Sequence, residues 1–261
     1  MNIFEAILYG AVQGVTEYLP ISSSAHLILL PRFLGEKDYG LSFDVFLHLG
    51  TFFATLVYFW SDWKKIFHSF KEKPVEEFYS WKVLFVATIP ALLCGALLHK
   101  WIQEQLRENI VLMFTLSIGG ILLFGVDRFS ASHKSLKNSS MKDALLMGIA
   151  QCFALIPGVS RSGSTITAGR MLGFTRESSA RFSFLMSGPV TLAAIVFEMR
   201  HWRELLQTEI GFFPLIVSGF CSFLFGMIAI AGLLKVVKKW SYLPFAVYRV
   251  LLGVLIYFVL S

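Results

Sequence analysis

Long apolar runs alternate with short polar segments along most of this chain. Six of these runs approach or reach the roughly 20 residues that an α-helix needs to cross a bilayer. They cover residues 43–60, 83–98, 110–126, 182–197, 212–234 and 242–260. The pattern therefore predicts an all-α polytopic membrane protein with six transmembrane helices.

Two polar, proline-containing stretches interrupt apolar sequence. One is Gln-Gly-Val-Thr-Glu-Tyr-Leu-Pro-Ile-Ser-Ser-Ser-Ala-His at residues 13–26, and the other is Pro-Gly-Val-Ser-Arg-Ser-Gly-Ser-Thr at residues 157–165. Polar and ionisable groups are costly at membrane depth unless they meet in a sheltered site. Pro20 and Pro157 each predict a break in a helix, and the serines that follow suit N-caps of a second short helix. We expect the function of the protein to reside in these stretches.

The two stretches belong to an internal duplication. Gly-Ala-Val-Gln at residues 10–13 resembles Gly-Ile-Ala-Gln at residues 148–151, which lies 138 residues later. Three predicted spans, an odd number, separate the copies, so the second copy enters the membrane from the opposite side. We therefore expect inverted repeats over approximately residues 1–127 and 141–261. Each repeat should begin with a re-entrant helix-turn-helix segment, and the two tips should meet near the midplane.

Composition and charge agree with one integral membrane domain. The 261 residues are 56% hydrophobic and only 15% charged, and the mean hydropathy is +0.66, which is too apolar for a soluble domain. The net charge of +6 is spread through loops without a pattern of basic and aromatic residues, which argues against nucleic acid as a partner. Lys and Arg concentrate in four segments, at residues 61–82, 128–142, 174–181 and 235–241. The positive-inside rule predicts that these segments are cytoplasmic.

The first stretch combines an acid, an amide and an imidazole. Gln13 and Glu17 are four residues apart and so share one face of a helix, and His26 follows beyond the turn. A carboxylate and an imidazole in a sheltered cavity can share proton transfer, or the carboxylate can hold a cation while the histidine acts as base or nucleophile. The alternative is that Glu17 and His26 only satisfy each other. Asp44 and His48 lie one turn apart, and we interpret them as a helix cap in preference to a supporting pair for the site.

The second stretch combines a guanidinium with small and hydroxylated residues. Arg161 in a Ser/Gly-rich turn at membrane depth is suited to pairing with an anion. The alternative role of Arg161 is a structural ion pair with Glu17. Arg161 can have both roles if this ion pair opens when phosphate binds. Gly158 and Gly163 allow the backbone to approach a ligand closely. Phosphate oxygens can accept hydrogen bonds from the side-chain hydroxyls of Ser160, Ser162 and Thr165. Two helix N-termini directed at one pocket would attract phosphate further.

Together these patterns closely resemble the undecaprenyl-diphosphate phosphatase family, also called bacitracin-resistance proteins. The resemblance implies catalytic roles for Glu17, Ser23, His26 and Arg161. It implies phosphate binding by Ser22, Ser24, Ser160, Ser162, Gly163 and Thr165. It also implies a metal site at Glu17 and Gln13 for a divalent cation, with Mg²⁺ expected and Ca²⁺ as the alternative. Some relatives have Glu where this chain has Gln13, so a cation would depend largely on Glu17 and on the phosphates of the substrate.

The resemblance also implies a reaction and a location. The reaction is hydrolysis of undecaprenyl diphosphate to undecaprenyl phosphate and inorganic phosphate, which recycles the lipid carrier for cell-wall synthesis. The expected location is the bacterial inner (plasma) membrane, the expected partners are the polyprenyl diphosphate lipid and the bilayer, and a homodimer stays open. Whether a covalent intermediate forms on His26 or Ser23, or water attacks directly, stays open as well.

Two other functions are compatible with parts of the pattern. Inverted repeats with broken helices are a common plan of transporters, so the same pocket could serve a flippase for a polyprenyl phosphate lipid. The other large class of membrane lipid phosphatases requires a histidine at the position that Thr167 occupies, which argues against that class. A purely structural role would leave the buried ionisable groups without purpose.

Overall fold

The computed structural model describes residues 1–74, 76–202, 205 and 210–260. The helices are α1 (Ile3–Tyr18), α2 (Ser23–Leu34), α3 (Leu41–Tyr58), α4 (Trp60–His68), α5 (Trp81–Gln105), α6 (Asn109–Phe129), α7 (Met141–Cys152), α8 (Arg161–Met171), α9 (Arg176–Glu198), α11 (Phe212–Val236) and α12 (Leu243–Leu260). Short 3₁₀ turns form at Glu77–Tyr79, Leu136–Asn138, Phe153–Leu155 and Met199–His201. Within the described ranges no β-strand is present, so the all-α prediction is confirmed.

Five helices are long and apolar enough to cross a membrane, in agreement with five of the six predicted spans. They are Leu41–Tyr58, Trp81–Leu98, Asn109–Phe129, Arg176–His201 and Phe212–Val236. The sixth predicted run forms α12, whose apolar part, Leu243–Val259, is shorter than the other five. The span predicted to begin at residue 182 begins earlier, at Arg176, because the Thr175 side chain caps the helix by accepting from the backbone N–H of Ser178.

Each polar stretch folds as two short helices joined by a turn, with α1 and α2 in the first and α7 and α8 in the second. The second helix of each pair begins after a serine N-cap, as predicted. Ser22 and Ser160, 138 residues apart, have φ of 76° and 72°, and no other non-glycine residue in the described part of the chain has a positive φ. Since this conformation is strained for a residue with a side chain, the same strain at matching positions indicates that both turns are built in the same way.

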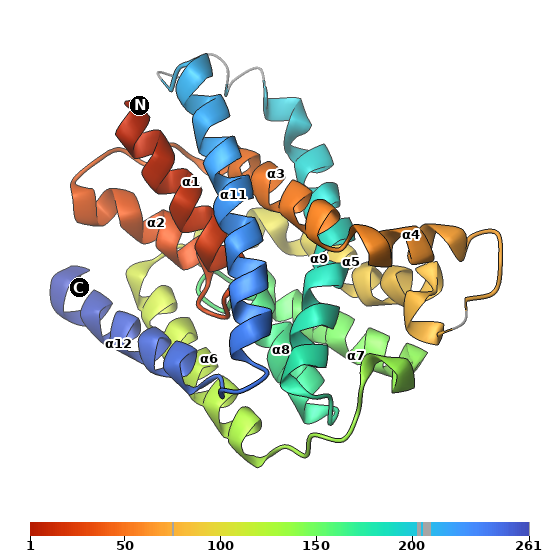
Figure 1. Cartoon of the computed structure of the whole chain (residues 1–261). Helices are drawn as coiled ribbons and strands as arrows, with labels where there is room; N and C mark the ends of the chain where they lie inside the picture. The colour runs from red at the N-terminus through yellow and green to blue at the C-terminus, as the bar shows by residue number, and fades with distance from the viewer. Residues whose placement is uncertain (75, 203–204, 206–209, 261) are drawn as a thin grey trace.

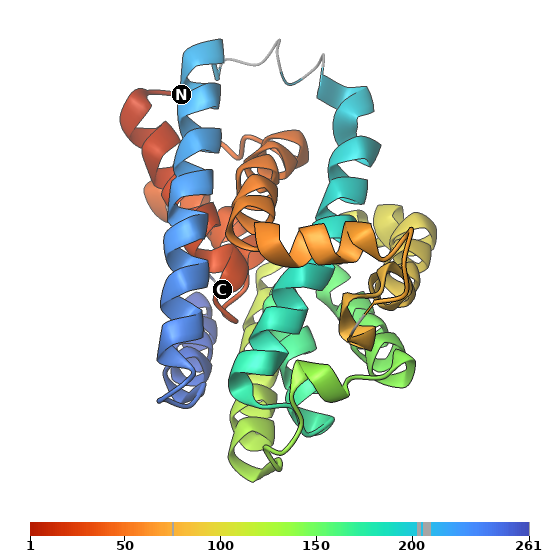
Figure 2. The ribbon, with the colours of Figure 1, turned by 45° about the vertical axis from the view of Figure 1, so that its right-hand side comes forward.

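The two halves of the chain are packed across each other. Figures 1 and 2 show α1 beside α11, and α7 lies against α5. Both contacts depend on small residues: a side chain at Gly10 would collide with the backbone of Ser218, and one at Gly148 with the backbone of Ala87. Close approach through small residues is how helices associate in lipid, where the solvent is as apolar as the side chains.

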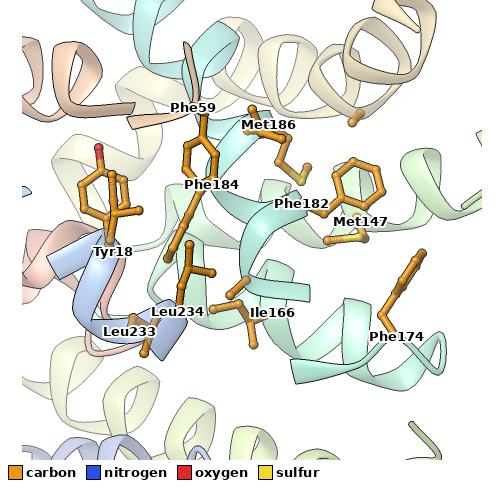
Figure 3. Close-up of a cluster of buried hydrophobic side chains, with 14 of the residues drawn as sticks. Tyr18, Phe59, Met147, Ile166, Phe174, Phe182, Phe184, Met186, Leu233 and Leu234 are labelled. Carbon is orange, nitrogen blue, oxygen red and sulfur yellow. The ribbon is translucent and has the colours of Figure 1, made fainter. Parts of the chain in front are cut away.

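A buried hydrophobic cluster lies between the turns and the long helices (Figure 3). Tyr18, at the end of α1, meets the ring of Phe184 edge-on at 5.1 Å. The Tyr18 hydroxyl donates to the carbonyl of Thr51 and lies 2.7 Å from the hydroxyl of Thr55. Because Glu17 immediately precedes Tyr18, these contacts fix the end of α1 that carries the carboxylate.

Candidate active site

The two turns touch, which brings the polar stretches into one site. Ser162 donates from its hydroxyl to the carbonyl of Leu19 at 3.0 Å. In the other direction, the backbone N–H of Gly158 donates to the Ser24 hydroxyl at 3.5 Å. The two turns therefore lie in contact, as the sequence predicts.

Glu17 is the centre of the site and is 7% exposed. One carboxylate oxygen, Oε2, lies 2.7 Å from Ser23 Oγ, 3.1 Å from Gln13 Nε2 and 3.3 Å from His48 Nε2. The other oxygen, Oε1, forms an ion pair with Arg161. A buried carboxylate is tolerated only when its charge is compensated, and here four donors from α1, α2, α3 and α8 surround it.

The structure places His48, rather than His26, against Glu17. His48 Nδ1 lies 2.7 Å from the backbone carbonyl of Asp44, which can only accept, so this nitrogen carries a proton. Its other nitrogen faces a carboxylate, so the arrangement is that of a protonated imidazole paired with Glu17. Our interpretation of Asp44 and His48 as a helix cap is wrong, because α3 begins after Gly40 without a side-chain cap hydrogen bond and His48 faces Glu17 instead. The spacing of the two residues within α3 carries no information about how α3 packs on α1.

His26 lies apart from the carboxylate and faces α12. Its Nδ1 is 2.7 Å from the carbonyl of Ser22, and its Nε2 is 2.6 Å from the hydroxyl of Tyr248. The expected direct contact between Glu17 and His26 is absent from the described hydrogen bonds and ion pairs. The chain turns at Ser22, and the first turn of α2 directs Ser23, not His26, toward Glu17.

Arg161 links the two turns. Besides pairing with Glu17, it donates to the backbone carbonyl of Ser183 at 3.3 Å. Thr165, one turn later, lies with its hydroxyl 2.7 Å from that of Ser183 and also donates to the carbonyl of Arg161 at 2.8 Å. The predicted alternative of a Glu17–Arg161 ion pair is thus the arrangement present here.

The two turns also present backbone donors. Ser22 Oγ accepts from the N–H of Ala25 at 3.4 Å, and Ser160 Oγ accepts from the N–H of Gly163 at 3.0 Å. The six amide groups of residues 22–24 and 160–162 have no acceptor among the described residues. Consecutive free N–H groups at a helix N-terminus form a concave donor surface that suits an anion.

Sequence reasoning missed Arg249, which braces both turns from α12. The residue is 1% exposed, and its guanidinium donates to five backbone carbonyls. These belong to Thr115, Leu116, Pro20, Gly158 and Val159. An arginine inside the apolar run at residues 242–260 was the available signal, since a charge within a membrane helix has a functional or structural partner by default.

Comparison with known proteins identifies the family to which these features belong. The family model described as bacitracin resistance protein BacA matches residues 6–255. The chain belongs to the BacA family. A relative from Gemmatimonas aurantiaca named undecaprenyl-diphosphatase is 43% identical, with 100% of this chain and 99% of the relative aligned. Relatives of the same name from Geotalea daltonii and Idiomarina loihiensis are 42% and 38% identical, each over 98% of this chain and over 97% and 98% of their own lengths.

Membership of the BacA family and the five apolar helices together make this a multi-pass membrane protein. The side chains on the outside of the bundle fit a lipid environment. Large hydrophobic residues point outward along the long helices, with Leu97 82% and Phe129 85% exposed. Polar residues are instead gathered at the contact between the turns, so the outward surface is the reverse of that of a soluble protein.

The side chains around Glu17 do not by themselves provide the ligands that a divalent cation needs. Among the described residues no group of three or more His, Cys, Asp or Glu side chains is close enough to hold a metal. Glu17 is already surrounded by donors, two of which, Arg161 and His48, are cationic. The Oε1 atom of Gln13 is buried without a hydrogen-bond partner, so it is one free oxygen ligand beside an occupied carboxylate.

Proposed function

We propose that this protein hydrolyses undecaprenyl diphosphate to undecaprenyl phosphate and inorganic phosphate at the contact between its two turns. The observation that carries the proposal is the Glu17–Arg161 pair, which joins the polar turns of both repeats beside unpaired backbone amides. The name undecaprenyl-diphosphatase, shared by full-length relatives, supports this substrate. The reaction recycles the lipid carrier of cell-wall synthesis, and the bacitracin resistance in the family's name accords with it.

The proposed architecture has six transmembrane helices and two re-entrant helix-turn-helix segments in inverted repeats. The repeats cover approximately residues 1–127 and 141–261, and α12 is the sixth span. Two matched features support the duplication: the strained serine caps at Ser22 and Ser160, and the close helix contacts at Gly10 and Gly148. With polar turns at the centre and apolar helices outside, the diphosphate can enter the site while its polyprenyl tail stays in lipid.

Phosphate recognition is assigned to donors from both turns. The backbone amides of residues 22–24 and 160–162 face one phosphoryl group each, and the serine hydroxyls add further donors. Ser22 and Ser24 serve the first turn, and Ser160, Ser162 and Thr165 the second. Gly163 keeps the first turn of α8 free of a side chain that would collide with Arg249. Arg161 leaves Glu17 for the terminal phosphoryl group, where a planar guanidinium can bind two oxygens.

Ser23 and Glu17 are the proposed nucleophile and base. Ser23 Oγ lies 2.7 Å from Glu17 Oε2, the geometry of an activated hydroxyl. Ser23 Oγ attacks the terminal phosphorus while its proton passes to Glu17. The bridging P–O bond breaks, and undecaprenyl phosphate leaves with the electron pair. Water then attacks the phosphorus of the phosphoserine while His26, one turn further along α2, accepts a proton from water. The P–O bond to Ser23 breaks, the serine oxygen takes back the proton from Glu17, and inorganic phosphate leaves.

A divalent cation is proposed to arrive with the substrate and not to reside in the protein. Diphosphate oxygens would supply most of its ligands, and Gln13 Oε1 would add one. Glu17 would be free to add another only after Arg161 has moved to the phosphate. Mg²⁺ is the expected ion and Ca²⁺ the alternative, and either would neutralise charge on the terminal phosphoryl group when bound.

Rapid-quench analysis with substrate labelled in its terminal phosphate tests this function. We expect phosphate release by the purified protein in detergent, and a labelled enzyme that is lost in Ser23→Ala. Glu17→Gln removes the base, and Arg161→Lys removes the planar two-oxygen contact with phosphate, so each should lower turnover by about 100-fold or more. Ser135→Ala, in an exposed loop, is the matched control.

Two outcomes would overturn this mechanism or function. Normal turnover of Ser23→Ala would exclude the serine nucleophile. Movement of the lipid between leaflets of proteoliposomes without any phosphate release would replace the hydrolase by a flippase. The bacterial inner membrane is the proposed location, because the substrate is a membrane lipid carrier, and a homodimer stays a prediction.

A further inference from the structure

His26 is held at both ring nitrogens by groups of different chemistry. Nδ1 lies 2.7 Å from the Ser22 carbonyl, an oxygen that only accepts, so Nδ1 carries a hydrogen. In a neutral ring Nε2 then has the lone pair, and it accepts from the Tyr248 hydroxyl at 2.6 Å. The backbone of α2 thus sets the tautomer, while a residue more than two hundred positions later binds the nitrogen that would take a proton.

The two rings are also nearly coplanar. The centroids of His26 and Tyr248 are 5.6 Å apart, and the ring planes differ by 7°. Because Nε2 and the hydroxyl oxygen are only 2.6 Å apart, the rings meet edge to edge, which directs the hydroxyl at the in-plane lone pair of Nε2. Arg249, the next residue of α12, donates to the carbonyls of Pro20 and Val159, so the helix that carries Tyr248 is itself fixed to both turns.

A hydroxyl is suited to both charge states of a histidine. It donates to Nε2 when the ring is neutral and accepts from Nε2–H after protonation. Neither phenylalanine nor a lipid chain can do this. Loss of the hydroxyl would leave a partly buried nitrogen without its partner in both states.

We propose that Tyr248 is a positioning residue for the proposed hydrolysis: its hydroxyl holds His26 Nε2 in place and covers its lone pair until the proton of water is accepted. This inference rests on the proposed role of His26 as base. It extends the site to α12, which none of the polar sequence stretches includes. It also predicts that turnover at the buried turns depends on Tyr248, although this side chain is 42% exposed.

The contact is tested without reference to activity by diethyl pyrocarbonate, which acylates unprotonated imidazole nitrogens. The rate at His26 is read by peptide mass spectrometry and divided by the rate at the exposed His68 of the same protein. In Tyr248→Phe, the ratio should rise by about 2- to 10-fold, the range that corresponds to one hydrogen bond. Tyr58→Phe is the matched control, since the Tyr58 hydroxyl has no partner among the described residues and its ring contacts Phe59.

Turnover supplies the second measurement. Tyr248→Phe should lower kcat by about 2- to 10-fold and leave KM nearly unchanged, because the hydroxyl acts through His26 and not on the bound lipid. Tyr58→Phe should match the parent protein in both quantities. The melting temperature of each variant in detergent shows that the comparison is made on folded protein.

The possible outcomes separate this inference from the base role on which it rests. An unchanged acylation ratio in Tyr248→Phe overturns the contact, whatever the activity. A raised ratio with unchanged kcat overturns the positioning role, provided that His26→Gln has lost turnover. Normal turnover in His26→Gln would overturn the base role itself, while the acylation measurement would still report whether Tyr248 covers Nε2.

Discussion

Replacement of Arg249 by methionine should give a folded protein with little activity. The side chain is 1% exposed, and its guanidinium binds carbonyls of α6 and of both turns. Methionine is also a long side chain but has no donor. The substitution therefore removes the brace while it largely fills the same space.

The expected change in stability is small because two effects oppose each other. The carbonyls of Thr115 and Leu116 lie inside α6 and keep their helical partners. The Gly158 and Val159 carbonyls, at 3.2 Å and 2.9 Å from the guanidinium, lose theirs, and the Pro20 carbonyl loses only a long contact of 3.5 Å. The two groups that lose a short hydrogen bond cost about 2–6 kcal/mol. Removal of a charge from the membrane interior returns about 2.5–3.5 kcal/mol. The net effect lies between slight stabilisation and a loss of about 3.5 kcal/mol.

Activity should fall much further than stability. Without the brace the two turns can separate, and a displacement of about 1 Å at a reacting group can lower the rate by about 100-fold. Phosphate release in detergent, measured beside the melting temperature, gives both quantities. Arg249→Lys should be impaired as well, because a compact ammonium cannot span carbonyls on both turns.

Arg128→Met, at the exposed end of α6, controls for loss of a positive charge. Turnover of Arg249→Met close to that of the parent protein would refute the brace. Turnover of Arg249→Lys equal to that of the parent protein would show that the site requires only the positive charge and not the several N–H donors of the guanidinium. Loss of the fold in Arg249→Met would contradict the balance of energies above.

Three further outcomes follow from the structure. Asp127 is 3% exposed and binds Arg170 at 3.1 Å and Arg176 at 2.7 Å, so Asp127→Asn should cost about 3–5 kcal/mol, visible as a lower melting temperature. Burial tends to raise the pKa of Asp143, but hydrogen bonds from Lys134 and its N-cap serine outweigh it and lower that pKa. The stabilisation from this carboxylate is present above its ordinary pKa and is lost as the pH falls through the lowered value, so Asp143→Asn should melt lower than the parent only at the higher pH. If the proposed ion arrives with the substrate, chelation of divalent cations should slow phosphate release without changing the melting temperature.

Each of these outcomes has a contrary result. Glu104→Gln, on an exposed face of α5, controls for loss of an acid and should melt like the parent. A melting temperature of Asp127→Asn equal to that control would show that the ion pairs contribute nothing. A difference for Asp143→Asn that persists at every pH would exclude the carboxylate charge as its origin. A lower melting temperature after chelation would indicate a resident ion.

The sequence alone was sufficient for the class of protein and for the two polar stretches that meet at the candidate site. Apolar runs near the length of a membrane crossing predicted five helices that the structure contains, because hydrocarbon imposes the same composition on any helix that crosses it. The breaks near Pro20 and Pro157 followed from local chemistry, since proline removes a helical donor and serine caps the next helix. The matching polar stretches also indicated that the two turns belong together.

The tertiary structure decided which of these groups touch. Glu17 meets His48 and Ser23 instead of His26, because contacts across helices depend on how α1, α2 and α3 are rotated and packed. Arg249 sits in an apolar run whose pattern predicts only a span, yet it binds both turns. Local sequence determines where a helix begins, ends and breaks, whereas the partner of a buried polar group is chosen by packing between segments that are distant in the chain.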